Sequence, residues 1–367
     1  WVNLKIVIFN RSYKYKSSLQ TISSFYREFL LFLKRVLKMN VFNTDQSLDA
    51  LISRANKVLP AGRFGNMPGD IVLERGKAGR VWDIKGTEYV DFLLGSGPMF
   101  VGHAHPDVTK AITEQAPQGT TFFANNQYGI KLAEEICEAM ACADQLRFVS
   151  SGSEATLYAM RLARAYRKRD KILKFEGGYH GMSDYSLMSL APTRLANYPQ
   201  ALPDSAGIPK QVSNEVIIAP FNDIETVKSL INEYQDELGG VIVEPFQRLI
   251  PPAPGFLEML REITLKYEIP LIFDEIVTGF RFSYGGAQDY YGVTPDLCTL
   301  GKIIGGGFPV AAVCGNKEIM KHFDKALVGE EDFLPQIGTL SGNPLASVAG
   351  LATLNILKPK SSYQKVF

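Results

Sequence analysis

The fold of this chain is decided by residues 146–175, which read LRFVSSGSEATLYAMRLARAYRKRDKILKF. The two ends of this stretch, 146–149 and 171–175, are short and mostly apolar, as expected of buried strands. Between them, over 153–168, apolar residues recur at helical spacing. A strand, a helix and a second strand in this order predict one repeat of a parallel α/β sheet.

The same alternation continues on both sides of this stretch. We expect further helices at 129–140, 223–235, 256–267 and 345–357, and further strands at 241–243, 270–273 and 310–314. Strands that are apolar throughout indicate an α/β fold with a mostly parallel sheet between helices. Ligands bind beyond the carboxyl ends of the strands in such sheets, so residues that follow strands are candidates for function.

Segments outside this α/β region carry other patterns. Residues 47–59 predict a capped amphipathic helix, and residues 71–94 alternate in a way that predicts a short antiparallel meander. At the other end, the chain stops at Phe367, soon after the break at Pro359. Because nothing there closes a domain, we expect a chain truncated at its C-terminus.

Composition and charge narrow the class of protein. Hydrophobic residues make up 46% and charged residues 21%, as in ordinary globular proteins. No apolar run approaches the ~18 residues that span a bilayer, so no membrane partner is expected.

Residues 1–38 carry eight basic residues and one acidic residue. This segment is either a transit-type leader or, as we favour, sequence upstream of a start at Met39. The remainder is mildly acidic, so no nucleic-acid partner is expected.

The cysteines and histidines suggest neither a disulfide scaffold nor a metal site. None of the four cysteines stands in a CxxC pair. Reduced thiols in a cytoplasmic protein are the simplest interpretation. His103 and His105 have no third ligand nearby in the sequence, so no metal is predicted.

Three small residues, Ser151, Gly152 and Ser153, follow the predicted strand 146–149 and begin the next helix. Small residues let the backbone approach an anion, and free N–H groups at a helix N-terminus attract it. The three are therefore candidates for binding a phosphate. A simpler interpretation, in which Ser153 only caps the helix, stays open.

An aromatic residue flanked by glycines follows strand 171–175, in the order Gly-Gly-Tyr179-His180-Gly. The glycines would let Tyr179 lie close over a flat ring. An ordinary glycine turn with one buried tyrosine is the alternative interpretation.

Two carboxylates close buried strands in the same manner. Glu244 follows strand 241–243, and Asp274 follows strand 270–273. A buried carboxylate is costly unless it is paired. The protonated nitrogen of a pyridine ring would provide such a partner, although Asp274 could also cap the element that follows it.

Lys302 stands between Gly301 and a glycine triplet in the apolar stretch LGKIIGGGFP, residues 300–309. Burial lowers the pKa of a lysine, which favours the uncharged amine that a Schiff base requires. A phosphate-binding P-loop is excluded, because such a loop needs Ser or Thr after the lysine and Ile303 stands there. A surface lysine beside a flexible turn remains as the simpler alternative.

Each of these signals is modest alone, but their order along the chain is informative. A phosphate turn, a stacking tyrosine, an aspartate for a ring nitrogen and a lysine together predict pyridoxal 5'-phosphate (PLP) as cofactor. In this interpretation Lys302 holds PLP as a Schiff base, and Asp274 and Tyr179 complete the catalytic group.

From about Leu48 to Leu357 the chain resembles the class III aminotransferases, in particular the glutamate-1-semialdehyde 2,1-aminomutases and their aminotransferase relatives. The most specific segments are GPMFVGHAHPDV (97–108), LIFDEIVTGFR (271–281), LGKIIGGGFPVAAVCG (300–315) and GTLSGNPLA (338–346). The resemblance implies a set of cofactor-binding residues: Ser151, Gly152, Ser153, Tyr179, His180, Glu244, Asp274, Ile276, Lys302 and Thr339.

The resemblance also implies a domain organisation and an assembly. The fold would be aspartate-aminotransferase-like, with a large PLP-binding domain at 101–345. A smaller α+β domain would combine residues 39–100 with whatever follows a connecting helix at 346–367, and residues 1–38 would be a leader of doubtful reality. Thr339 would reach the phosphate of the neighbouring subunit's cofactor, which implies a homodimer with shared active sites.

The implied reaction is transamination, in which Lys302 moves a proton between the substrate and the cofactor. The substrates would be an amino acid or amine and an oxo acid. Two segments depart from the aminomutase pattern: 123–127 replaces a GAPTE-like run, and 247–250 replaces a GNMN-like run. Arg63 stands near the position of a carboxylate-binding arginine in relatives, and a solvated loop arginine explains it equally well.

Three hypotheses for function therefore stand. The first is a transaminase that acts on some other amino acid or amine, which the departures favour. The second is the aminomutase itself, which moves an amino group within one substrate. The third is a truncated family member without catalysis, against which the presence of Lys302, Asp274 and Tyr179 argues.

Overall fold

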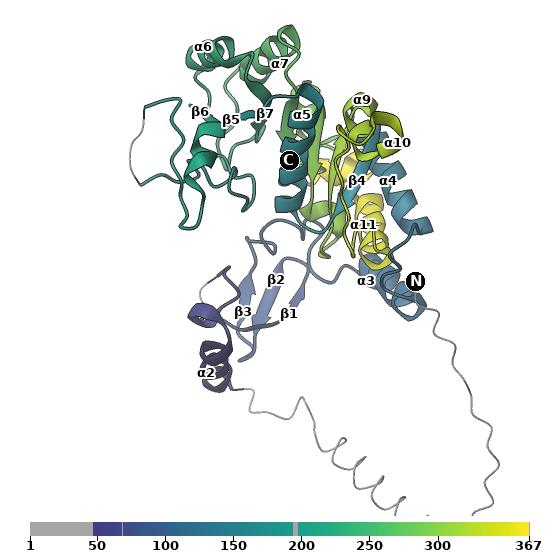
Figure 1. Cartoon of the computed structure of the whole chain (residues 1–367). Helices are drawn as coiled ribbons and strands as arrows, with labels where there is room; N and C mark the ends of the chain where they lie inside the picture. Colours follow the sequence, from purple (N-terminus) through teal and green to yellow (C-terminus); the bar gives the residue numbers. More distant parts are fainter. Residues whose placement is uncertain (1–46, 68, 194–196, 367) are drawn as a thin grey trace, which may run out of the picture. The chain divides into compact units, whose positions relative to one another are not determined.

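A computed structural model describes residues 47–67, 69–193 and 197–366 (Figure 1). The chain divides into two compact units, one formed by Trp1–Arg75 with Trp82–Glu88 and the other by Gly76–Val81 with Tyr89–Phe367. The leader predicted at 1–38 lies outside the described residues. The units are described separately below.

The first unit begins with helix α2 (Leu48–Val58), which confirms the helix predicted there. Ser47 is its N-cap, and its Oγ accepts a hydrogen bond from the backbone N–H of Ala50. Asp49 in the first turn and Lys57 in the last turn both oppose the helix dipole. The cap and these charges explain why the helix begins and ends where it does.

A three-stranded sheet follows, in the order β1-β2-β3. Its strands are β1 (Leu73–Lys77), β2 (Arg80–Asp83) and β3 (Glu88–Val90). The connections at 78–79 and 84–87 are too short for a parallel crossover, so neighbouring strands run antiparallel. The predicted meander is thus confirmed.

The second unit contains a seven-stranded sheet, in the order β4-β10-β9-β8-β7-β5-β6. Neighbouring strands from β9 to β6 pair in parallel, whereas β10 runs antiparallel to both β9 and β4. The sheet is therefore mostly parallel, as predicted. The strands are β4 (Gln145–Val149), β5 (Lys171–Phe175), β6 (Val216–Ala219), β7 (Leu238–Val243), β8 (Leu271–Asp274), β9 (Leu297–Leu300) and β10 (Ala311–Gly315). Strands β6 and β9 were not among the predicted strands.

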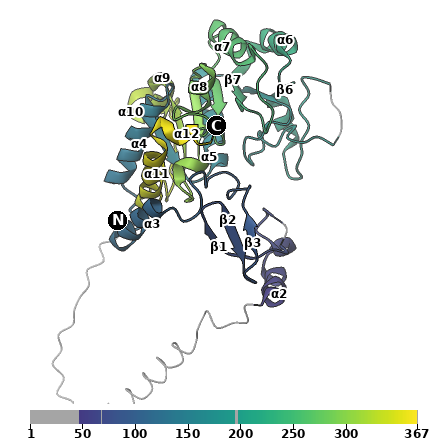
Figure 2. The same cartoon turned by 180° about the vertical axis from the view of Figure 1, so that it is seen from behind.

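Helices cover both faces of this sheet (Figures 1 and 2). On one face Ile172, Ile242 and Ile272 belong to a core shared with α5 (Gly152–Arg167) and α9 (Lys317–Met320). Leu173 and Phe273, one position along their strands, point to the other face, as the strand period of two requires. That face is covered by α4 (Gln127–Ala139), α6 (Ile224–Tyr234), α7 (Phe256–Lys266) and α11 (Pro344–Leu357).

This core is the main source of stability for the sheet. Each fully buried Leu, Ile or Phe contributes about 1.5–3 kcal/mol relative to its exposed state. Phe175, Phe221 and Phe256 form a cluster with ring centroids 5.0–5.9 Å apart, at the carboxyl end of β5. Edge-to-face packing of this kind fixes the position of the strand end that precedes the Gly-Gly-Tyr-His-Gly turn.

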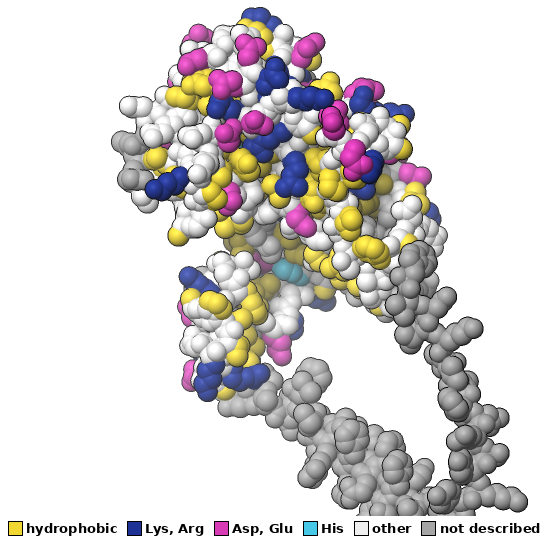
Figure 3. All heavy atoms as spheres, in the orientation of Figure 1, with side chains coloured by type: hydrophobic (Ala, Val, Ile, Leu, Met, Phe, Trp, Pro, Cys, Tyr) yellow, Lys and Arg dark blue, Asp and Glu magenta, His cyan; other side chains and the backbone are white. Residues whose placement is uncertain are grey.

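Shorter helices complete the unit: α3 (Pro106–Gln115), α8 (Gly286–Tyr291), α10 (Lys325–Val328) and α12 (Lys360–Gln364). Helix α11 packs against α3, α4 and the 3-10 turn η4 (Lys302–Gly305). On the face shown in Figure 3, basic and acidic side chains of this unit are interspersed with apolar ones. Among the described helices, none has the length and apolar character needed to cross a membrane.

Candidate active site

Four of the predicted residues lie at one edge of the sheet. Tyr179, Glu244, Asp274 and Lys302 stand at or just beyond the carboxyl ends of β5, β7, β8 and β9, which run parallel. Together with residues at the start of α5 they line one cavity of about 180 Å³. Its lining consists of Gly152, Ser153, Thr156, Tyr179, Gly181, Glu244, Asp274, Ile276, Val277 and Lys302.

Asp274 is a buried carboxylate with three hydrogen bonds. Its Oδ1 accepts from the Thr299 hydroxyl at 3.0 Å and from the backbone N–H of Ile276 at 3.2 Å. Its Oδ2 lies 2.7 Å from Nδ1 of His180. Thr299 reaches it because β8 and β9 pair Asp274 with Thr299 directly. These contacts satisfy the buried charge and hold the carboxylate in one orientation.

His180 lies behind Asp274 and is almost fully buried. Its backbone carbonyl accepts hydrogen bonds from the hydroxyls of Thr156 at 2.6 Å and Ser186 at 2.7 Å. Its second ring nitrogen, Nε2, is buried and has no hydrogen-bond partner among the described residues. His180 contacts Asp274 but does not itself line the cavity.

Lys302 enters the cavity from the turn that follows β9. Its backbone has φ of 46°, in the left-handed region that a non-glycine residue rarely adopts. Such strain is typical of functional positions. Burial lowers the pKa of its amine; Asp274 and Glu244 oppose this, and Arg281 adds to it. The amine is thus uncharged more readily than that of an ordinary lysine.

The start of α5 also lines the cavity, through Gly152, Ser153 and Thr156. Ser151 is the N-cap of α5, and its Oγ accepts from the N–H of Glu154, whose carboxylate accepts from the N–H of Ser150 at 2.9 Å. The cap is therefore Ser151, whereas the simpler sequence interpretation placed it at Ser153. The Oγ of Ser153 accepts instead from the N–H of Met182 at 3.2 Å.

Gly181 brings the Gly-Gly-Tyr-His-Gly turn onto this helix start. A Cβ at Gly181 would lie 2.6 Å from Cα of Ser153, and its φ is 86°. No other residue type fits this position without displacing one of the two segments. Glycine at this position therefore lets the turn pack directly against the N-terminus of the helix.

Glu244 and Tyr179 are joined by a hydrogen bond from the backbone N–H of Tyr179 to Oε2 of Glu244, at 2.8 Å. Burial raises the pKa of Glu244. The Tyr179 ring remains partly exposed, and the guanidinium carbon of Arg248 lies 5.2 Å from its centroid. Arg248 belongs to the segment 247–250 that departs from the aminomutase pattern, so this departure lies beside the cavity.

Besides His180, three other predicted residues lie outside the cavity lining. Ser151 caps α5 and does not line the cavity. Thr339 is exposed, and its carbonyl accepts a hydrogen bond from the Thr121 hydroxyl at 3.3 Å. Arg63 is exposed in the first unit. Within the single chain, the second unit therefore supplies the cavity without these three side chains.

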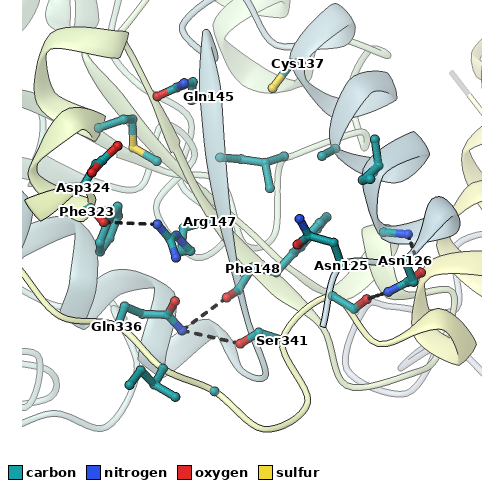
Figure 4. Close-up of a pocket in the computed structure, with 18 of the residues that line it drawn as sticks. Asn125, Asn126, Cys137, Gln145, Arg147, Phe148, Phe323, Asp324, Gln336 and Ser341 are labelled. Carbon is teal, nitrogen blue, oxygen red and sulfur yellow. Dashed lines mark hydrogen bonds between the residues drawn. The ribbon is translucent and has the colours of Figure 1, made fainter. Parts of the chain in front are cut away.

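The loop that carries Thr339 borders a larger groove of about 850 Å³ along β4, one of the two edge strands of the sheet (Figure 4). Figure 4 shows the Gln336 amide donating to the carbonyl of Phe148 and to the Ser341 hydroxyl, both at 3.4 Å. On the other side Asn126 caps α4 and donates to the carbonyl of Gly342 at 2.7 Å. These contacts fix the loop against α4 and β4.

The histidines that were considered for a metal have other partners. His103 Nε2 lies 2.6 Å from a carboxylate oxygen of Asp91, and His105 caps α3. Within the described part of the chain, no group of three or more His, Cys, Asp or Glu side chains is arranged to hold a metal ion.

Comparison with known proteins places this chain in a family. The model of the family described as aminotransferase class-III matches residues 63–366. The chain belongs to the class-III aminotransferase family. The predicted family membership is thus confirmed, and the family consists of PLP-dependent enzymes.

Individual class-III relatives carry two kinds of name. A curated protein of Brevibacillus brevis, named glutamate-1-semialdehyde 2,1-aminomutase 2, is 44% identical over 326 residues, which cover 86% of this chain and 74% of the relative. The crystal structure of an omega-transaminase from Sphaerobacter thermophilus is 40% identical with a TM-score of 0.80, covering 87% of this chain and 75% of that one. A structure titled "Transaminase with PLP bound" is 31% identical with a TM-score of 0.78, covering 85% and 74%. These structures confirm the predicted α/β fold.

Proposed function

We propose that this class-III chain transfers amino groups between an amino acid or amine and an oxo compound, with PLP as cofactor and Lys302 as the residue that binds it covalently. The observation that carries this proposal is the single cavity at the carboxyl edge of the sheet. It contains the Lys302 amine, the Asp274 carboxylate and the N-terminus of α5.

The residues of the cavity fit this cofactor. Asp274 provides a fixed, buried carboxylate for a protonated ring nitrogen. The first turn of α5 presents N–H groups that have no intrahelical partner, as a phosphate requires. A Cβ at Gly152 would meet the Ile276 side chain at 3.1 Å, so glycine there keeps space open between the helix and Ile276. Tyr179 and Ile276 offer surfaces for the two faces of a flat ring.

Each side chain then has a distinct task. The bound cofactor would supply an electron sink for the carbon that carries the substrate amine. Lys302 would take the proton from that carbon through its Nζ, for which the lowered pKa of its amine is suited. Asp274, oriented by His180 and Thr299, would hold positive charge on the ring nitrogen.

The experiment that tests the proposal is a panel of amino donors, added to the chain in the presence of PLP. Conversion of the cofactor to its amino form is followed by absorbance, and Lys302→Ala is the matched control. We expect at least one donor to convert the wild-type cofactor and none to do so at a comparable rate in the variant. Absence of a Schiff-base absorbance band, or a band that survives unchanged in Lys302→Ala, would support the non-catalytic hypothesis instead.

A second candidate function is the aminomutase, which the name of the Brevibacillus relative favours. The two segments that depart from the aminomutase pattern argue for the transaminase: Arg248 of one lies over Tyr179 beside the cavity, and residues 123–126 of the other line the groove along β4. An assay with glutamate-1-semialdehyde and no added acceptor separates them. An aminomutase consumes this substrate over many turnovers, whereas a transaminase stops after one half-reaction.

The proposal includes a homodimer with shared active sites, for which the groove along β4 is the contact surface. Large apolar side chains are exposed around Thr339, namely Phe122, Phe123, Ile337 and Leu340. A second copy of the chain would cover them. It would also bring Thr339, which is exposed and outside its own chain's cavity, to the partner's cofactor.

Mixing two inactive variants tests this arrangement. Lys302→Ala removes the lysine and Thr339→Asp places a negative charge beside the implied phosphate. In a mixed dimer one site has both native residues, so unfolding and refolding the two variants together should restore activity that neither shows alone. Activity that stays absent in the mixture, with dimers demonstrated by sedimentation, would contradict shared sites.

The proposed location is cytoplasmic. The cysteines of the described residues are free, and three of them, Cys142, Cys298 and Cys314, are buried. Reduced thiols are typical of that compartment. Cell fractionation with an antibody to the chain tests the location directly.

A further inference from the structure

Arg281 is a cation held in place by hydrogen bonds to two backbone carbonyls. Its Nε donates to the carbonyl of Val277 at 2.8 Å, and its Nη2 donates to the carbonyl of Gly97. Its guanidinium carbon lies 5.0 Å from the centroid of the Phe100 ring. Among the described residues, no Asp or Glu forms an ion pair with Arg281. Because a guanidinium does not lose its proton in proteins, a fixed positive charge stands at this place.

Gly97 places this charge next to Lys302. A Cβ built on Gly97 would lie 3.1 Å from Cδ of Lys302 and 3.3 Å from Nη2 of Arg281. The two side chains therefore flank the same backbone position. Gly97 has φ of 107°, so a side chain there would be strained as well as wedged between the two.

We propose that Arg281 is a positioning residue for Lys302, whose fixed charge beside the lysine side chain favours the uncharged amine. This inference rests on the proposed function of Lys302. A lysine is activated either by desolvation or by a neighbouring cation, and Lys302 has both. The charged groups that act on its amine are Asp274 and Glu244, which favour the protonated form, and Arg281, which opposes them. Burial acts in the same direction as Arg281.

The test measures the protonation of Lys302 directly, in the chain freed of cofactor. The rate at which a small amine-directed reagent labels Lys302 is followed by peptide mass spectrometry as a function of pH, with the exposed Lys110 as internal standard. We expect Arg281→Met and Arg281→Gln to move the midpoint of the Lys302 profile to higher pH. Arg281→Lys, which keeps the charge, should leave it near the wild-type value. At pH values below the midpoint, a shift of one pH unit would lower the labelling rate of Lys302 about tenfold.

A matched control removes an arginine elsewhere in the same unit. Arg261 pairs with Asp296 at 2.8 Å and lies near the amino end of β9, away from Lys302. Arg261→Met should lower the thermal midpoint of unfolding without moving the Lys302 profile. An unchanged midpoint in both neutral Arg281 variants, or an equal shift in Arg281→Lys, would overturn the proposal. Because labelling needs neither PLP nor turnover, a failure here is distinguishable from a failure of the proposed function.

Discussion

Two lysines of this chain, the half-buried Lys302 and the fully buried Lys174, show what separates a candidate catalytic amine from a structural one. Burial lowers the pKa of both, and Glu244 acts on both. Lys174, in β5, has its Nζ between the carbonyls of Met188 at 2.5 Å and Ser186 at 3.1 Å. Lys302 instead lines the cavity, with Arg281 nearby.

The difference teaches that a lowered pKa alone does not identify a catalytic lysine. An uncharged amine still has two N–H donors, which match the two carbonyls that surround Lys174. That amine anchors the segment after His180, and Lys174 does not line the cavity that Lys302 lines. Lys302 combines its lowered pKa with access to a space that a small molecule can enter.

The largest expected effect follows from removing the amine at the cavity. Lys302→Ala should reduce the rate of amino transfer by roughly 10²–10⁴-fold, the range for loss of a general base, because no other lysine among the described residues lines the cavity. Steady-state rates with the best amino donor provide the measurement. Lys174→Ala should retain far more activity, and equal losses in the two variants would erase the proposed distinction between them.

Removing the charge at Asp274 should have the next largest effect. Asp274→Asn keeps the shape but loses charge-assisted hydrogen bonds, which contribute about 1.5–3 kcal/mol each. We therefore expect cofactor affinity to fall by roughly 10–100-fold, measured by titration with PLP. An affinity equal to that of the wild type would mean that the carboxylate does not face the ring nitrogen.

Substitution of Lys174 should reduce stability more than substitution of Lys302, which is the reverse of the order expected for activity. Lys174→Met leaves the carbonyls of Ser186 and Met188 buried without their donor, and an unsatisfied buried group costs about 1–3 kcal/mol. Lys302→Met removes a partly desolvated amine and should change the free energy of unfolding much less. Denaturant unfolding of both variants checks this, and a larger loss in Lys302→Met would contradict the structural role given to Lys174.

The smallest expected effect is a pH dependence of stability. Burial lowers the pKa of Lys174 from 10.5 to about 8, so between these values the unfolded chain binds more protons than the folded one. The contribution of this group to stability therefore rises with pH across that window and is lost as pH falls through about 8. The difference in unfolding free energy between wild type and Lys174→Met should grow from pH 8 to pH 10. A difference that shrinks over this range would show that the amine is charged in the fold.

The sequence predicted the sheet, its helices and most of the cavity because those features depend on local patterns. Apolar runs identified β5, β7 and β8, and each candidate residue followed the end of its strand. The strand before Lys302 was missed, although the run Leu-Cys-Thr-Leu at 297–300 is a signal that could have identified β9. The four residues of β6 were missed in the same manner.

The contacts that complete the site could not be predicted, because they join residues that are distant in the sequence. Thr299 reaches Asp274 through the register of β8 and β9, which no local pattern specifies. Arg281 approaches Lys302 only where the loop after β8 meets Gly97. Pairing between strands and packing between loops set these distances, and both arise only in the folded chain.

The most direct test of Lys302 as the lysine that binds the cofactor is to reduce the chain with borohydride in the presence of PLP and to map the modified peptide. Reduction makes the bond between a lysine and the cofactor permanent, so the modified residue is the one that held it. We expect a single modification at Lys302 and none at Lys174. Modification at Lys174, or at any lysine other than Lys302, would contradict this role of Lys302.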